Sequence, residues 1–198
     1  MHMGQRSQIY VRYQKDGVNY LVARYYQWNY GERMISRCRH GIEWIKEMLN
    51  YDWYLTTETE KLKRILDVNF DMQDIVMGCD IIKEYHEEDF WKEDGTSFNE
   101  AVFKCQDNND GKLFIDIKNG TIKYAFLDYD CDTKRIMNAE QYMNWDSEGW
   151  ITNEYIDDEQ KLMCFNNIKA IAEMAKLMTK EEIEDFINCD YKQEKEMI

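Results

Sequence analysis

The dipeptide Asp16-Gly17 limits what this chain can fold into more than any other feature, because it predicts a tight turn with a fixed strand register. Glycine accepts the positive φ that a type I′ turn requires, and Asp-Gly between alternating residues is a strong hairpin signal. With these two residues as the loop, Lys15 faces Val18, and a hairpin over residues 6–27 follows. A fixed register also determines which side chains share a face.

The two faces of this hairpin differ in chemistry. One face is mostly apolar and consists of Ile9, Val11, Tyr13, Tyr20, Val22 and Arg24. The opposite face mixes polar, charged and aromatic side chains, namely Arg6, Gln8, Tyr10, Arg12, Leu21, Ala23, Tyr25 and Gln27. We expect the first face to be core. Arg, Gln and Tyr stack and hydrogen-bond but are poor core residues, so the second face is expected to be polar. It is either a partner-binding surface made by Arg6, Gln8, Tyr10, Arg12 and Tyr25, or a structural hub that the acidic C-terminal helices cover.

A long amphipathic helix is predicted to begin at Tyr30-Gly31-Glu32. Apolar residues recur at three- and four-residue spacing, as Met34, Ile35, Cys38, Ile42, Ile45, Met48 and Leu49. A second stripe holds Arg33, Arg37, His40 and Trp44, and Arg39 with Glu43 predicts an i,i+4 ion pair. An arginine stripe is typical of a solvated face. The functional alternative is a partner-binding surface in which Arg33 and Arg37 act together with the hairpin arginines.

A second hairpin is predicted around Asn119-Gly120, which pairs Ile117 with Ile122 and leaves Asp116 facing solvent opposite Lys123. An odd-length loop at residues 107–111 would place Phe103 and Cys105 on the same apolar face, giving a three-stranded meander between residues 101 and 130. We therefore predict one α+β domain over residues 1–198. Its antiparallel sheet would combine the N-terminal hairpin with the meander, and about five to six helices would lie on one side. Residues 1–3 resemble a vector remnant, and residues 192–198 are expected to be frayed.

Capping boxes predict where several of the later helices begin. They are Thr57-x-x-Glu60, Asn138-x-x-Gln141 and Thr179-x-x-Glu182. A further helix is expected after Asp71, with Ile75, Val76, Cys79, Ile82 and Tyr85 buried, and another over residues 158–178, with Phe165, Ile168, Ala172 and Ala175 inward. The last helix would bury Ile183, Phe186 and Ile187 and present a dense negative patch on its outer face, made of Glu181, Glu182, Glu184 and Asp185.

Charge separates the first quarter of the chain from the rest. Residues 1–50 hold eight Arg or Lys and four Asp or Glu, a net of +4, whereas the remainder holds 17 and 35, a net of −18. Such asymmetry points to interaction more than to catalysis. An acidic exterior repels nucleic acid, so direct binding of DNA or RNA by the whole chain is not expected.

Signatures of common enzymes and cofactor sites are missing from the sequence. No phosphate-binding glycine loop and no nucleophile elbow is present, and the chain has only three His, so no catalytic residue and no cofactor is predicted. Six isolated Cys show neither zinc nor disulfide spacing, and no apolar run of about 18 residues is found. Carboxylates gather in two turns, 107–111 and 128–132, but neither places a Glu at the twelfth position of a calcium loop, so no metal is predicted. A cytoplasmic protein is expected.

Three segments carry a resemblance to known proteins: RSQIYVRY with LVARYYQWNYGERMISRCRHGIEWIK, NNDGKLFIDIKNGTIKYAFLD, and NAEQYMNWD. Together they resemble small uncharacterised proteins of bacteriophages and prophages. The resemblance implies a setting in which compact acidic proteins antagonise host defence, as anti-CRISPR proteins do. The function expected is thus binding to a bacterial defence protein, such as a CRISPR nuclease, at its basic nucleic-acid-binding surface. A nucleic-acid-binding module built on the Arg/Tyr hairpin face and a phage housekeeping protein are the alternatives.

Overall fold

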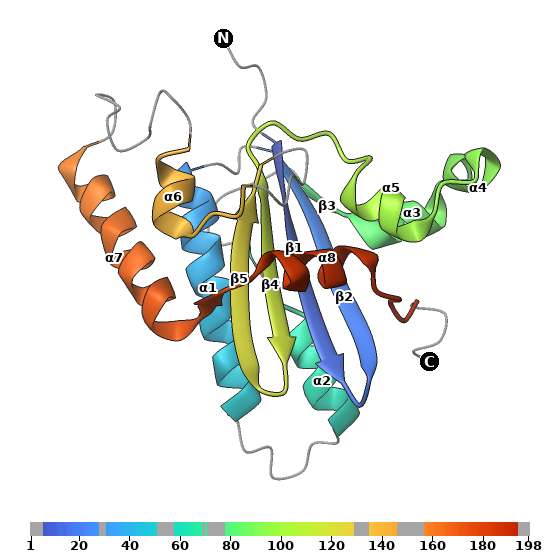
Figure 1. The fold of residues 1–198 in the computed structure, drawn as a ribbon, viewed down its shortest axis with the longest axis horizontal. Helices are drawn as coiled ribbons and strands as arrows, with labels where there is room; N and C mark the ends of the chain where they lie inside the picture. The colour runs from blue at the N-terminus through green and yellow to red at the C-terminus, as the bar shows by residue number, and fades with distance from the viewer. Residues whose placement is uncertain are drawn as a thin grey trace.

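A computed structural model describes residues 6–27, 31–50, 58–68, 70, 78–128, 135–145 and 157–193. It confirms a mixed α+β fold, built on one six-stranded sheet with the strand order β3-β2-β1-β4-β5-β6 (Figure 1). The strands are β1 (Arg6–Lys15), β2 (Val18–Gln27), β3 (Gly78–Asp80), β4 (Lys112–Lys118), β5 (Thr121–Leu127) and β6 (Lys176–Leu177). Eight helices accompany them in the described part of the chain, more than the five to six expected.

The sheet has a larger hydrophobic core on one face and a smaller one on the other. Four helices lie on the side of the larger core, either against the sheet itself or against a helix that contacts it. They are α1 (Gly31–Asn50), α2 (Glu58–Leu66), α6 (Ala139–Met143) and α7 (Asp158–Met174). The others are α3 (Ile81–Glu87), α4 (Phe90–Asp94), α5 (Phe98–Phe103) and α8 (Lys180–Asn188). Of these, α3, α5 and α8 supply the smaller core on the opposite face.

Both predicted hairpin registers are confirmed. Lys15 pairs with Val18 across the Asp16-Gly17 turn, and Ile117 pairs with Ile122 across Asn119-Gly120. In each turn both loop residues have positive φ, 52° and 78° in the first and 51° and 72° in the second. Those values belong to the left-handed region that type I′ turns need and that Gly and Asn adopt most readily.

The predicted antiparallel meander is wrong in its first strand. The chain over Phe98–Phe103 is helix α5, whose N-cap Ser97 accepts a hydrogen bond from the backbone N–H of Glu100. A short apolar run does not distinguish a strand from a buried helix by its period, and here the cap favoured the helix. As a result β4 lies directly beside β1 and runs parallel to it, so the sheet is mixed.

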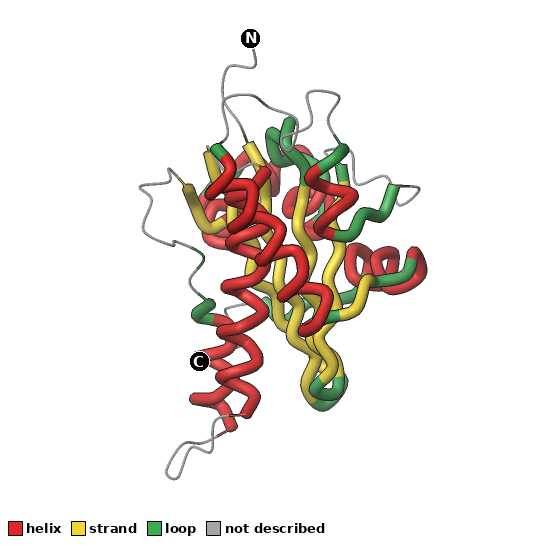
Figure 2. Tube along the Cα trace, turned by 90° about the vertical axis from the view of Figure 1, so that its left-hand side faces the viewer, coloured by secondary structure: helices red, strands yellow, loops and turns green. Residues whose placement is uncertain are grey.

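Helices cover both faces of the sheet, not one. Ile9, Val11 and Ile115 are fully buried in the larger core beneath α1, as predicted. On the other face Tyr10 and Phe114 are equally buried, beneath α5 and α8. Figure 2 shows the strands running between helices on their two sides. The prediction of one-sided cover failed because the mixed hairpin face continues into apolar residues of β4 and β5 that also need burial.

Most of the predicted helices are found, but two differ in detail. The stripe of α1 is buried except at Leu49, which is half-buried, and the capping boxes of α6 and α8 are formed. In α7 the buried residues are Cys164, Asn167 and Ile171. The predicted inward row is right for Ala175, which is buried, and for Ile168, which packs against the larger core, but wrong for Phe165 and Ala172, which are exposed. Asn167 occupies the inward row because it hydrogen-bonds Arg39 and Ser36 of α1.

The region after Asp71 also departs from the prediction. Cys79 belongs to β3, and the helix that holds Ile82 and Tyr85 begins only at Ile81, capped by Asp80. The cap positions Thr57 and Asp71, like residues 1–3, lie outside the described residues. At the other end Lys192, expected to be frayed, donates its backbone N–H to the carbonyl oxygen of Asn19 at 2.9 Å. Within the described ranges, no helix has the length and apolar character needed to cross a bilayer.

Candidate functional site: the hairpin face beneath helix α8

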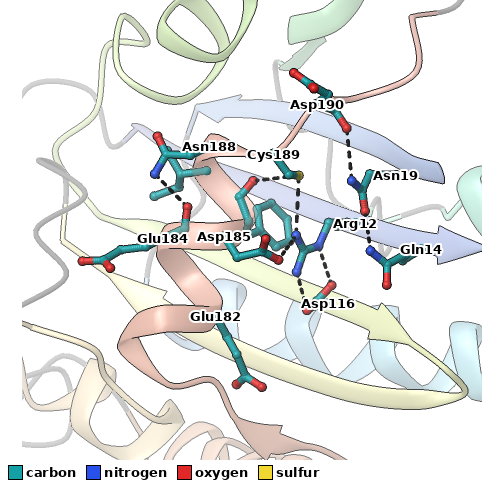
Figure 3. Close-up of polar contacts among 12 residues, drawn as sticks. Arg12, Gln14, Asn19, Asp116, Glu182, Glu184, Asp185, Asn188, Cys189 and Asp190 are labelled. Carbon is teal, nitrogen blue, oxygen red and sulfur yellow. Dashed lines mark hydrogen bonds and ion pairs between the residues drawn. The ribbon is translucent and has the colours of Figure 1, made fainter. Parts of the chain in front are cut away.

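Helix α8 lies across the polar face of the hairpin and brings the two predicted functional regions together (Figure 3). Its inward residues Ile183 and Phe186 are fully buried, and the Phe186 ring meets the Phe114 ring of β4 edge-on at 5.0 Å. The chain beyond the helix is tied to the hairpin through Asn19, whose side chain donates to the carbonyl oxygen of Asp190 at 3.1 Å. The polar face of the hairpin is thus covered by α8. We call the contact region between this face and α8 the Arg12 layer.

Arg12 is the centre of this layer and is only 1% exposed. Its Nε and Nη2 atoms each donate to one carboxylate oxygen of Asp116 at 2.8 Å, a bidentate pair. Its Nη1 atom donates to Asp185 of α8 at 2.7 Å and lies 3.5 Å from the sulfur of Cys189. The guanidinium carbon also lies 4.9 Å from the centroid of the Phe186 ring, a cation–π contact.

Parallel pairing of β1 with β4 explains why Arg12 and Asp116 meet, since the two are register partners. Burial by itself would lower the pKa of Arg12, but the hydrogen bonds and charge of Asp116, together with the hydrogen bonds to Cys189 and Asp185, outweigh it and raise the pKa above its ordinary value. The guanidinium therefore stays charged inside the protein. An arginine in this state joins sheet and helix and, because it is buried, is not accessible to an external partner.

The rest of the predicted binding face is also engaged inside the fold. Tyr10 is fully buried, and its hydroxyl donates to the carbonyl oxygen of Val102 at 2.8 Å. Gln8 is equally buried and donates to the carbonyl oxygen of Asp107 at 2.9 Å. Tyr25 is half-buried, and burial is the chief reason that its pKa lies above the ordinary value.

Arg6 begins β1 and is held by the acidic turn at residues 107–111. Its Nη1 atom donates to Asp107 at 2.5 Å, and its backbone N–H donates to the side chains of Asn109 and Asp110, both at 2.7 Å. The carboxylates of this turn therefore bind the start of a strand. The other acidic turn lies mostly outside the described residues, and within the described ranges no group of three potential ligands is placed to hold a metal ion.

Helix α1 turns its candidate arginines inward as well. Arg37 is 3% exposed, with its guanidinium carbon 5.4 Å from the centroid of the Tyr26 ring, and Arg33 is half-buried. Arg39 forms the predicted ion pair with Glu43 at 2.8 Å. All eight Arg and Lys residues of the first 50 are buried or half-buried. The arginines of the predicted binding surface are therefore buried or only partly exposed to solvent.

The negative patch predicted on α8 is smaller in the structure. Asp185 pairs with Arg12, and Glu182 is half-buried in an ion pair with Lys123 of β5. Partial burial would raise the pKa of Glu182, but the Lys123 ammonium and the backbone N–H of Thr179 hold it below its ordinary value. Only Glu181 and Glu184 remain as exposed carboxylates without a partner in the sheet, although Glu184 lies 3.5 Å from Lys180 on its own helix.

The exposed surface as a whole is nevertheless strongly acidic. Among the described residues, 22 Asp or Glu side chains are exposed but only ten Arg or Lys side chains. Large apolar side chains are also exposed among the described residues, namely Phe90 on α4, Leu162, Met163 and Phe165 on the outer face of α7, Val18 on β2 and Leu177 on β6. The Phe90-Trp91 pair between acidic runs was the signal available for the first of these.

Two cavities lie away from the Arg12 layer. One of about 510 Å³ is bounded by the end of α1, the β4–β5 turn and the end of α7. The other, of about 90 Å³, lies beside β2 and α3. Neither is lined by Arg12, Asp116, Asp185 or Cys189. Comparison with known proteins adds no further guide: no family model, no curated protein and no solved structure matches this chain.

Proposed function

We propose that this protein is a phage-encoded binding protein that acts without catalysis in the cytoplasm of a bacterial host. Its acidic surface occupies the basic nucleic-acid-binding surface of a defence effector, and a CRISPR nuclease is the effector class expected. The observation that supports this most is the sorting of charge between interior and surface. All eight basic residues of the N-terminal quarter are buried or half-buried, whereas 22 carboxylates among the described residues are exposed.

The same sorting counts against a nucleic-acid-binding module built on the hairpin face. Such a module needs Arg and Lys side chains that reach phosphates. Arg12 donates to Asp116 and Asp185, and Arg6 donates to Asp107. A surface with this excess of carboxylates repels a nucleic acid but complements a protein channel that binds one.

The α8 side offers a sharp test because two of its carboxylates, Asp185 and Glu182, pair with the sheet and the other two do not. Reversing Asp185 or Glu182 would break contacts with Arg12 or Lys123 and would confuse stability with binding. The double variant Glu181→Lys/Glu184→Lys leaves those contacts in place. A matched control, Glu159→Lys/Glu173→Lys, reverses two exposed carboxylates on α7.

The assay is DNA cleavage by purified, guide-loaded CRISPR nucleases, each tested alone with increasing amounts of the protein. We expect inhibition of at least one nuclease that is complete near equal molar amounts. The α8 double variant should raise the inhibitor concentration needed by about tenfold, through slower association, whereas the α7 control should act as the parent does. Equal inhibition by parent and α8 variant, or inhibition by catalytic amounts of the protein, would contradict the proposal.

A further inference from the structure

Residues 81–94 form an arm, the α3–α4 arm, that projects from the body of the molecule (Figure 1). Its base is fixed. Asp80 caps α3 by accepting hydrogen bonds from the backbone N–H groups of Ile82 and Lys83 at 3.0 and 3.1 Å, and it pairs with Arg24 of β2. Ile81 and Ile82 are buried in the core beneath α5 and α8. The arm is therefore a defined part of the fold, on the same side of the sheet as α8.

The tip of the arm presents aromatic side chains to solvent. Phe90 is 51% exposed, Trp91 is half-buried, and their ring centroids lie 4.0 Å apart. None of the five residues of α4 is buried, and Gly95, with φ of 75°, ends the helix. Exposed apolar side chains of this size are unfavourable in water, and Phe and Trp are the types that protein interfaces enrich at their centres.

Carboxylates flank the aromatic tip along the chain. Residues 83–94 contain two lysines and six acidic residues, which are Glu84, Glu87, Glu88, Asp89, Glu93 and Asp94, all exposed. Both lysines are already paired within the arm, Lys83 with Glu87 at 3.7 Å and Lys92 with Asp89 at 2.8 Å. An apolar centre with a rim of net negative charge matches the general anatomy of a docking site, with the rim setting which partner is accepted.

From this arrangement we propose that the α3–α4 arm is the docking element for a basic protein partner. Phe90 and Trp91 enter an apolar pocket of that partner, and the carboxylates of the arm pair with Lys and Arg around the pocket. The inference rests on the proposed function and specifies where the partner is held. Charge disfavours the other occupants, because a second copy of this chain would bring the same acidic rim and a nucleic acid would bring phosphates.

A random peptide library displayed on phage tests the docking element directly. Short peptides are selected on the immobilised full-length protein, synthesised and titrated against it at about 0.1 M salt, where charges are screened over about 10 Å. We expect the enriched peptides to place Lys or Arg on both sides of an apolar residue. Phe90→Ala should weaken their binding by about tenfold or more, as loss of a central aromatic contact does.

Phe165→Ala is the matched control, since it removes another exposed Phe, on α7, and should leave peptide affinity unchanged. Enrichment of peptides without basic residues, no enrichment, or equal affinity of the parent and Phe90→Ala would overturn the docking element. If basic peptides bind Phe90→Ala normally but lose affinity for Glu181→Lys/Glu184→Lys, the acidic surface still binds, and the assignment to the arm alone fails. A Phe90-dependent dimer in light scattering, or Phe90-dependent binding of single-stranded DNA, would also overturn it by naming a different occupant.

Discussion

At the scale of single residues, Arg12 shows how the fold uses charges that the sequence suggested were free to bind a partner. Arg12 and Asp116 form a buried ion pair with bidentate geometry. Removing one member of such a pair destabilises a protein, because the other charge stays buried without a partner. The second carboxylate, Asp185, is 55% exposed at its side chain, and water screens its contribution. The two acidic partners of Arg12 should therefore differ in their importance for stability.

Arg12→Ala should lower the free energy of unfolding by about 3 kcal/mol, because Asp116 stays buried without its partner. Asp185→Asn, which removes only the exposed partner, should lower it by at most about 1 kcal/mol. Urea denaturation followed by circular dichroism measures both values. An Arg12→Ala variant as stable as the parent would show that the buried Arg12–Asp116 pair does not stabilise the fold.

Glu182 gives a prediction of pH dependence. Its pKa is depressed in the folded protein below the ordinary value of 4.5, so its contribution to stability is present above that value and is lost as the pH falls through the folded pKa. As the pH falls below 4.5, the melting temperature of the parent should therefore fall more than that of Glu182→Gln, which lacks the titrating carboxyl group. Melting temperatures of both proteins across this range give the comparison, and parallel curves would argue against a depressed pKa.

At the scale of secondary-structure elements, local signals predicted what local physics controls. The Asp16-Gly17 and Asn119-Gly120 turns gave correct registers because a type I′ turn determines the pairing of its own two strands. The capping boxes of α6 and α8 likewise predicted where those helices begin. Both devices act within a few residues, so a single sequence is sufficient to identify them.

Long-range pairing was not predictable in this way. Nothing near Arg12 in the sequence indicates that the distant strand β4 lies parallel beside β1, and without that pairing Asp116 is expected to face solvent, although it is buried. In the sequence, the mixed hairpin face suggests a binding role because Arg12 and Gln8, considered without partners, are poor core residues. Each is acceptable there only with partners from β4, α8 and the 107–111 turn.

Helix α8 closes the second face of the sheet, and Phe186 is its main apolar contact. This ring is fully buried and meets Phe114 at 5.0 Å and Phe103 at 6.0 Å. Phe186→Ala should lower the free energy of unfolding by about 3–5 kcal/mol, through lost burial and the cavity left behind. Phe165→Ala, on the exposed face of α7, should change it little. Similar denaturation midpoints for the two variants would contradict the role given to α8.

At the scale of the whole molecule, the exposed charge of the described residues is predominantly negative. The N-terminal arginines are buried or half-buried among the sheet, helices and turns. Among the described residues, exposed Asp and Glu side chains therefore outnumber exposed Arg and Lys side chains. With a net charge of −14, the protein should attract basic surfaces and repel nucleic acid at low salt. Binding that depends on this field should weaken as salt rises, since screening shortens its range.

Competition with DNA for a captured partner tests the central proposal most directly. The parent protein is immobilised, incubated with a bacterial lysate treated with nuclease, washed, and then eluted either with a short DNA duplex or with buffer alone. Mass spectrometry identifies and quantifies the released proteins. If the acidic surface occupies nucleic-acid-binding surfaces, DNA should release effector proteins with basic channels, and the Glu181→Lys/Glu184→Lys variant should capture less of them. Bound proteins that DNA does not release, and that the variant captures equally well, would contradict the proposal.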